Sequence, residues 1–193
     1  MAYRTIQPPF ANLKFWTMPK DELRTYYRWF LVEIPERIPE LEKAVSETPG
    51  YEHWRAEGTR SSLDPLSEWF VGQVETRPRT PEELAEMKGE SPFPIDIEPD
   101  ELTNRTFSLA MDIGMYLSQV LMKNLPGLRW EHPLGSPKFV DYGQPVLRGS
   151  GRVPLNPVRV VVTLAYGIAR KPQRGQRLRE LYDIWSKKLV ADE

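Results

Sequence analysis

The side chains that most often perform chemistry in enzymes are scarce in this sequence. It contains no cysteine and only two histidines, His53 and His132. A structural zinc site takes four Cys or His ligands, and a catalytic zinc site usually takes two or three histidines. No Gly-x-Ser-x-Gly nucleophile motif occurs either. We therefore expect no catalytic residue, no metal and no cofactor, and a protein that is not an enzyme.

Asp112 is the best candidate for acid–base chemistry among the carboxylates. It lies in Leu109–Gly114, within the most apolar helix that the sequence predicts. Burial would raise the pKa of its carboxyl group, and a buried carboxylate needs a cationic partner. An arginine of the C-terminal half, where basic residues gather, is the expected partner. A structural ion pair, or an exposed position at the edge of the helix, is the simpler interpretation.

Charge is divided unevenly along a chain whose formal net charge is −1. Residues 1–100 hold 12 basic and 19 acidic side chains, whereas residues 101–193 hold 14 basic and 8 acidic ones. Such asymmetry indicates a charged partner. It also arises when two halves of one domain attract each other, and the sequence leaves both interpretations open.

A basic stretch between Tyr142 and Arg179 contains eight basic residues and no acidic one. Within it, Gly149-Ser150-Gly151 precedes a predicted helix start at Asn156-Pro157, where backbone N–H groups attract anions. The spacing matches neither nucleotide-binding glycine fingerprint, so a tight turn also explains these glycines. The candidate anion- or partner-binding residues are Arg148, Arg152, Arg159, Arg170, Lys171 and Arg174.

An acidic, proline-rich segment, residues 78–101, is the other candidate surface. Its prolines predict a loop, although Thr80–Glu83 matches a capping box and predicts a short helix that ends at Met87. A solvated linker is the simpler interpretation. The candidate partner-binding residues are Glu82, Glu83, Glu86, Glu90, Asp96, Glu98 and Asp100.

Apolar periodicity and breaker residues predict the elements that carry these side chains. Pro35 is expected to end the first helix. Residues 157–169 are rich in β-branched side chains, which favours a strand. The segment is too long for a typical strand, however, so we predict a helix. The remaining predicted helices, of which the first is the one that Pro35 ends, cover about 17–34, 39–47, 62–74, 103–124 and 176–190.

Short apolar segments separated by glycines predict two or three antiparallel strands, at residues 128–131, 139–141 and 146–148. The elements together predict an α+β fold in a single domain, residues 1–193. This domain is mainly helical, with a small antiparallel sheet or hairpin in the C-terminal half. Residues 1–16 are expected to form an extended arm, tied down by Phe10, Phe15 and Trp16.

The chain has no apolar run of the ~18 residues that a membrane-spanning helix needs, and its first residues lack the apolar core of a signal peptide. We therefore expect a cytoplasmic protein with no membrane partner. The isoelectric point of 6.2 is low for a dedicated nucleic-acid-binding protein. Another protein is the favoured partner, and nucleic acid is the less favoured one.

The layout of the C-terminal half resembles a known group of proteins. A predicted helix from Arg105 to Asn124 precedes Pro126-Gly127-Leu128-Arg129-Trp130, which is followed by Asp141–Leu147 and by Asn156-Pro157. Through its loose turn and tryptophan spacing, this layout resembles small bacterial families found among the immunity-type proteins of toxin systems. The resemblance implies a non-catalytic protein that binds and blocks a cognate toxin. It assigns no role to any residue.

These observations predict a non-enzymatic protein-binding protein, an immunity-type inhibitor that occludes a cognate bacterial toxin. The acidic segment would suit a basic partner such as a nuclease, and the basic stretch an acidic one. The alternative is a nucleic-acid-associated or regulatory protein that uses the basic residues between 148 and 179.

Overall fold

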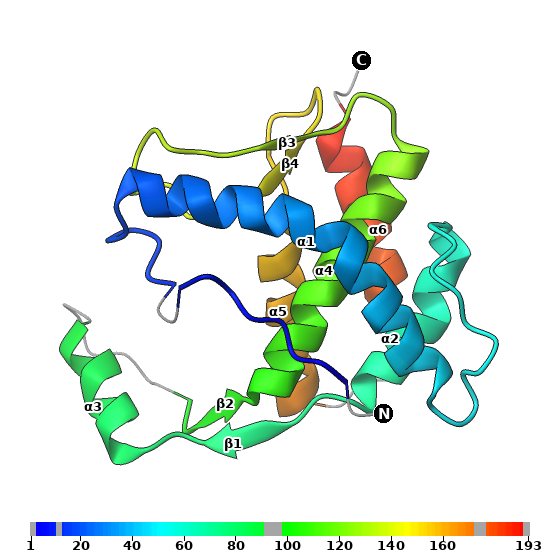
Figure 1. Ribbon diagram of the computed structural model, residues 1–193, viewed down its shortest axis with the longest axis horizontal. Coiled ribbons are helices and arrows are strands. Elements are labelled where there is room, and N and C mark those ends of the chain that lie inside the picture. Colours follow the sequence, from blue (N-terminus) through cyan, green and yellow to red (C-terminus); the bar gives the residue numbers. More distant parts are fainter. Residues whose placement is uncertain (1–2, 11–12, 91–97, 172–176, 191–193) are drawn as a thin grey trace.

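The computed structural model describes residues 3–10, 13–90, 98–171 and 177–190. In these residues, helices predominate and the strands are short (Figure 1), which confirms the predicted mainly helical α+β fold. The elements, in chain order, are α1 (Lys20–Ser46), the 3₁₀ turn η1 (Arg60–Ser62), α2 (Leu63–Val71), β1 (Thr76–Pro78), α3 (Pro81–Glu90), β2 (Asp100–Leu102), α4 (Asn104–Asn124), β3 (Arg129–Glu131), β4 (Val146–Arg148), α5 (Pro157–Arg170) and α6 (Arg177–Leu189).

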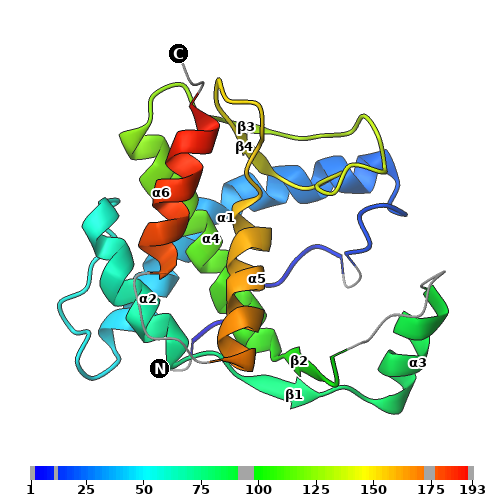
Figure 2. The same ribbon diagram turned by 180° about the vertical axis from the view of Figure 1, so that it is seen from behind.

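Helix α4 lies at the centre of the fold. The hydroxyl group of its N-cap residue, Thr103, accepts a hydrogen bond from the Thr106 N–H, and nearly every side chain from Thr106 to Leu121 is buried. Helices α1, α5 and α6 pack around it (Figures 1 and 2). A helix that is apolar on almost every side is usually central, so the prediction for residues 103–124 is confirmed.

Helix α1 corrects the prediction that Pro35 ends one helix and that another begins near Pro39. The helix runs unbroken from Lys20 to Ser46 with both prolines inside it, and both prolines are exposed. A proline inside a helix costs about 3 kcal/mol. Packing against the core outweighs this cost at Pro35 and Pro39, because the buried stripe of α1 continues past both prolines. The bend of α1 in Figure 1 is the distortion that internal prolines produce. The buried stripe comprises Leu23, Tyr26, Phe30, Ile34, Arg37, Leu41 and Val45.

Helix α5 settles the choice between strand and helix for residues 157–169 in favour of the helix. The side chain of its N-cap residue, Asn156, accepts a hydrogen bond from the Arg159 N–H, and Pro157 occupies the first turn. α5 lies against α4 at Gly114, where an added Cβ atom would come 2.9 Å from the Val158 Cα. The absence of a side chain at Gly114 therefore allows the two helices to approach closely.

Strands β3 and β4 form the antiparallel hairpin predicted for the C-terminal half, with Trp130 opposite Leu147. The third predicted strand, residues 139–141, is wrong, because these residues lie in turns. The reason is that the buried carboxylate of Asp141 accepts hydrogen bonds from the side chains of Asn156 and Arg159, which hold this segment against the start of α5.

A second two-stranded sheet was not predicted. Strands β1 and β2 pair antiparallel, with Arg77 opposite Glu101, and α3 lies between them in the chain. Segment 78–101 is therefore not one loop, and its predicted short helix extends to Glu90. Each strand has three residues and β1 ends in Pro78, so neither is long enough to show the two-residue alternation that predicts a strand.

The described part of the N-terminal arm has no regular secondary structure. It crosses α4 in Figure 1 and contacts α1 through Arg37. Phe10 and Phe15 pack against the apolar cluster between these helices, as expected. Trp16 does not anchor the arm, because 61% of its surface is exposed. The polar contacts described below supply the anchoring that Trp16 does not.

Of the helices described, none has the length and apolar character that crossing a membrane requires.

The close approach at Gly114 generates a paired prediction. We expect Gly114→Ala to lower the free energy of unfolding by about 1–3 kcal/mol, because the new methyl group must displace the α5 backbone. Gly167→Ala, in α5, is the matched control, since an added Cβ atom there meets nothing within 4 Å. It should stabilise the protein by about 0.5–1 kcal/mol through helix propensity. Urea denaturation measures both, and equal effects would contradict the packing argument.

Candidate functional site

A buried ion pair joins α1 to α4 at the centre of the molecule. The Arg37 guanidinium donates to both carboxylate oxygens of Asp112, with Nε–Oδ1 and Nη2–Oδ2 distances of 2.8 Å. The side chain of Asp112 is 0% exposed and that of Arg37 is 2% exposed. The structural ion pair interpretation of Asp112 is therefore correct. Its partner comes from the acidic N-terminal half, however, and not from the basic stretch as expected.

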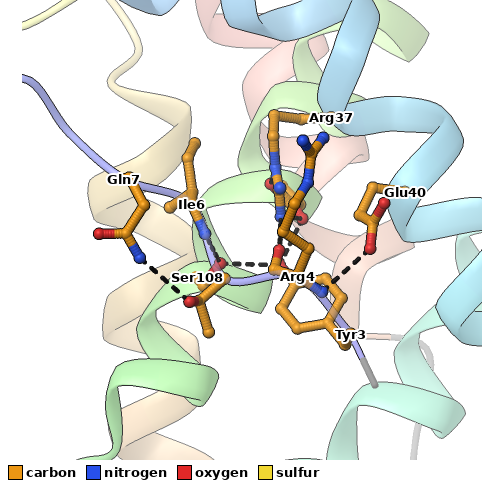
Figure 3. A network of polar contacts seen from close by, with 9 residues as sticks. Tyr3, Arg4, Ile6, Gln7, Arg37, Glu40 and Ser108 are labelled. Carbon is orange, nitrogen blue, oxygen red and sulfur yellow. Dashed lines mark hydrogen bonds and ion pairs between the residues drawn. The ribbon is translucent and has the colours of Figure 1, made fainter. Parts of the chain in front are cut away.

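The same ion pair anchors the N-terminal arm (Figure 3). The Tyr3 hydroxyl donates to Asp112, and the Arg37 Nη2 donates to the Tyr3 hydroxyl at 2.9 Å and to the Arg4 carbonyl oxygen at 2.7 Å. The Ser108 Oγ accepts the Ile6 N–H at 2.7 Å. These bonds satisfy the polar groups of both charged partners, which is the condition for a tolerable buried ion pair.

The electrostatics of this network favour a structural role. Burial raises the pKa of the Asp112 carboxyl from its ordinary value, and hydrogen bonds from Arg37 oppose the shift. Burial and the neighbouring carboxylate of Asp112 also raise the pKa of the Tyr3 hydroxyl. Both carboxylate oxygens accept hydrogen bonds from protein donors and the side chain is fully buried, so Asp112 has no exposed position from which to exchange a proton with a substrate.

A cavity of about 880 Å³ lies beside this network. Its walls come from the arm, α1, α4, α5, Glu101 of β2 and the segment just before β4. The Ser108 and Met111 side chains that line it are neighbours of Asp112 on α4. Ligand pockets typically have volumes of ~300–1,000 Å³ and mainly apolar walls. The apolar side chains that line this cavity are Ile6, Pro8, Phe10, Leu13, Phe15, Tyr26, Phe30, Phe107, Met111, Pro145, Val158 and Val162.

The described acidic candidate residues lie on α3 and at or just before the start of β2. Glu83 and Glu101 both bind Arg77, at 2.7 and 2.6 Å, while Glu86 binds Lys14 of the arm. Glu98 binds Arg170 at 2.8 Å. Glu82 and Asp100 are exposed and have no ion-pair partner among the described residues. Asp96 and the side chain of Glu90 lie outside what the structure describes.

The basic candidate residues do not gather at one site, because most of them pair with separate carboxylates. Arg148 binds Glu131 and Arg159 binds the buried Asp141, so both help to hold the hairpin and the start of α5 in place. Arg170, at the far end of α5, binds Glu98. Arg152 and Lys171 are exposed without a described ion-pair partner. Arg174 lies outside the described residues.

The Gly149-Ser150-Gly151 segment is a structural turn in this fold. The Gly151 N–H donates to the Leu189 carbonyl oxygen at the end of α6 at 2.9 Å. Added Cβ atoms at Gly149 and Gly151 would come within 2.1 and 2.0 Å of backbone carbonyl oxygens of α6. Glycine is therefore required by the contact with α6, and the Gly151 N–H is not available to bind an anion.

His132 also has a structural position. Its ring stacks on Tyr27 with 4.5 Å between the ring centroids, and its Nε2 lies 3.2 Å from the Gly143 carbonyl oxygen. Burial lowers the pKa of His132 below its ordinary value, which keeps the ring neutral near pH 7. In the part of the chain that the structure describes, no group of three or more His, Asp or Glu side chains is arranged to hold a metal ion.

Sequence reasoning missed two polar clusters that organise the fold. Arg37 belongs to the buried stripe of α1, three residues after Ile34 and four before Leu41, and this spacing was the signal that could have identified it. The second cluster consists of Asp141, Asn156 and Arg159, and it joins a turn to the start of α5. The sequence had no signal for the burial of Asp141, because this residue lies between two short irregular segments.

Comparisons with protein-family models, with curated proteins and with solved structures found no match for this chain. The resemblance of the C-terminal half to immunity-type proteins therefore stays a prediction.

The buried ion pair generates a stability prediction. Arg37→Met leaves the Asp112 carboxylate buried without a cation, and we expect it to lower the free energy of unfolding by about 3–5 kcal/mol. The double variant Arg37→Met/Asp112→Leu should lose less than the single one, because no charge stays buried. Arg24→Met, which breaks an exposed pair with Asp21, is the control and should change little. A double variant less stable than Arg37→Met would contradict this account.

Glu83 generates a prediction about titration. Hydrogen bonds from the Arg77 side chain and the Thr80 N–H lower the pKa of Glu83 to about 2. A carboxyl pKa lowered by folding stabilises the fold above the ordinary pKa of 4.5, and this contribution disappears as pH falls toward 2. In carboxyl-detected NMR, Arg77→Met should move the Glu83 midpoint upward toward 4.5, while Arg55→Met leaves it unchanged. An unmoved midpoint in Arg77→Met would contradict the assigned cause.

Proposed function

We propose that this protein is a non-enzymatic, protein-binding protein, an immunity-type inhibitor that blocks a cognate toxin by occupying a basic surface on it. Its contact surface is the acidic projection, defined as residues 76–90 and 98–102, which comprise β1, α3 and β2. The projection contains seven acidic and three basic residues. This assignment chooses between the two charged surfaces that the sequence left open.

The observation that carries the proposal is the position of α3. This helix stands apart from the helices around α4 in both views (Figures 1 and 2). Glu82 and Glu86 lie four residues apart, so they occupy the same face of α3. Like charges at this spacing disfavour the helix. Lys14 pairs with Glu86, and a basic partner would neutralise Glu82 as well. Lys88, by its spacing, lies on a different face.

The basic stretch supports the alternative less well. Arg148, Arg159 and Arg170 are engaged by carboxylates of the same chain, so a nucleic-acid phosphate would have to displace them. Of these three pairs, Arg170–Glu98 joins the basic half to the acidic half, and the other two lie within the C-terminal half. An acidic partner, protein or nucleic acid, would therefore have few unpaired basic groups to bind.

Capture from cells that produce this protein tests the proposal. We expect wild-type protein to retain a protein with a basic surface, and Glu82→Lys/Glu86→Lys to lose it. Asp21→Lys/Glu36→Lys is the matched control, because it makes the same change of charge at exposed residues of α1 and, like the test variant, breaks one exposed ion pair. The control should bind like wild type, and a functional assay of the captured protein should show inhibition by wild type.

The purified pair then gives quantitative outcomes. We expect affinity to fall with added salt and to weaken on the order of tenfold in the Glu82→Lys/Glu86→Lys variant. Equal retention by wild type and by this variant would overturn the role of the projection. Tight binding of the wild-type protein to DNA or RNA, with the steep salt dependence of phosphate contacts, would favour the nucleic-acid alternative.

A further inference from the structure

The cavity beside the Arg37–Asp112 network is lined by segments that are far apart in the sequence, including β2 at Glu101 and the turn before β4 at Pro145. The arm contributes Ile6 and Phe15, α1 contributes Phe30, α4 contributes Phe107, and α5 contributes Val162. Aromatic side chains on three of these segments give it broad apolar walls. The volume of about 880 Å³ lies within the range of small-molecule pockets, ~300–1,000 Å³.

The charged groups at the cavity are already neutralised by the protein. Lys14 binds Glu86, and Glu101 binds both Arg77 and Arg79, at 2.6 and 3.1 Å. A charged ligand would have to compete with these ion pairs or be desolvated against apolar walls, which is costly without a partner. The cavity therefore favours a ligand without charge.

The polar groups deeper in the wall are also satisfied. Asn156 donates to Gln144 at 2.9 Å and accepts the Arg159 N–H at 3.0 Å. The Ser108 Oγ accepts the Ile6 N–H and lies 2.8 Å from the Tyr3 hydroxyl. These contacts leave the interior suited to apolar groups.

Two exposed amides at the cavity retain hydrogen-bonding capacity. Among the described residues, Asn104 has no side-chain hydrogen bond, and Gln7 uses only its amide N–H, toward the Thr5 Oγ1 at 3.2 Å. Both residues line the cavity. Amides at an exposed rim can orient a ligand through its polar end while the apolar walls contact the remainder.

We propose that this cavity binds a neutral, largely apolar small molecule whose polar end faces Gln7 and Asn104. Among the described lining residues, Glu101 is the one that the acidic projection contributes, and the variants that test the cavity lie on α4 and α5 instead. The two proposals therefore fail separately.

Nile red, a neutral dye whose fluorescence increases in apolar surroundings, is the probe for the test. Wild-type protein should give a saturable increase that corresponds to one site. Decanol should displace the dye, and decanoate at the same concentration should displace it less, because only the alcohol is uncharged. An increase without saturation, or displacement by decanoate equal to that by decanol, would overturn the proposal.

Variants locate the binding site. Val162→Trp fills the cavity from α5 and should abolish the saturable signal, whereas Thr163→Trp adds the same ring at the next, exposed position and should leave it unchanged. Asn104→Trp narrows the rim at an exposed residue and should weaken the saturable signal. It replaces Val162→Trp in the test if circular dichroism shows that Val162→Trp is not folded. Wild-type dye binding in a folded cavity variant would show that the dye binds elsewhere and would overturn the assignment.

Discussion

A carboxylate buried in the middle of the central helix is the constraint on which the rest of the structure depends. α4 is apolar on nearly all sides, yet it carries Asp112 with no solvent exposure. An ionised carboxylate in such a place is tolerable only with a cation and a full set of hydrogen bonds. Arg37 supplies the cation and Tyr3 a further donor, so this one side chain fixes how α1 and the arm lie on α4.

Ion pairs nearer the surface also hold segments of the chain beside one another. Charges of the two halves meet within the molecule, where Arg60 meets Asp183, Arg170 meets Glu98 and Arg179 meets Asp64. Exposed pairs of this kind contribute little stability each. Their effect is on geometry, since they favour particular segments lying beside one another.

Long apolar patterns made the helices predictable from the sequence. The spacing over residues 103–124 and the Asn156-Pro157 start signal both led to helices that the structure contains. Local rules failed where tertiary packing outweighed them, as at Pro35 and Pro39 inside α1. Strands of three residues were partly missed, because so few positions cannot show an alternation.

The candidate sites were harder to predict, for a physical reason. A charged residue in the sequence does not reveal whether it binds a partner or another part of its own chain, and the basic stretch turned out to be largely paired internally. The cavity could not be predicted either, because its walls combine Ile6, Phe30, Phe107 and Val162 from four distant segments. Only the burial of Asp112 was suggested in advance, by its position in an apolar helix.

The anchoring of the arm has a consequence for the order of assembly. Tyr3 and Asp112 are 109 residues apart in the sequence, and the surface that receives the arm exists only after α1 and α4 have met. The arm therefore docks after α1 and α4 have packed together, and its contacts add to a core that these helices have already formed. Since the arm forms one wall of the cavity, the cavity itself is completed only by this late contact.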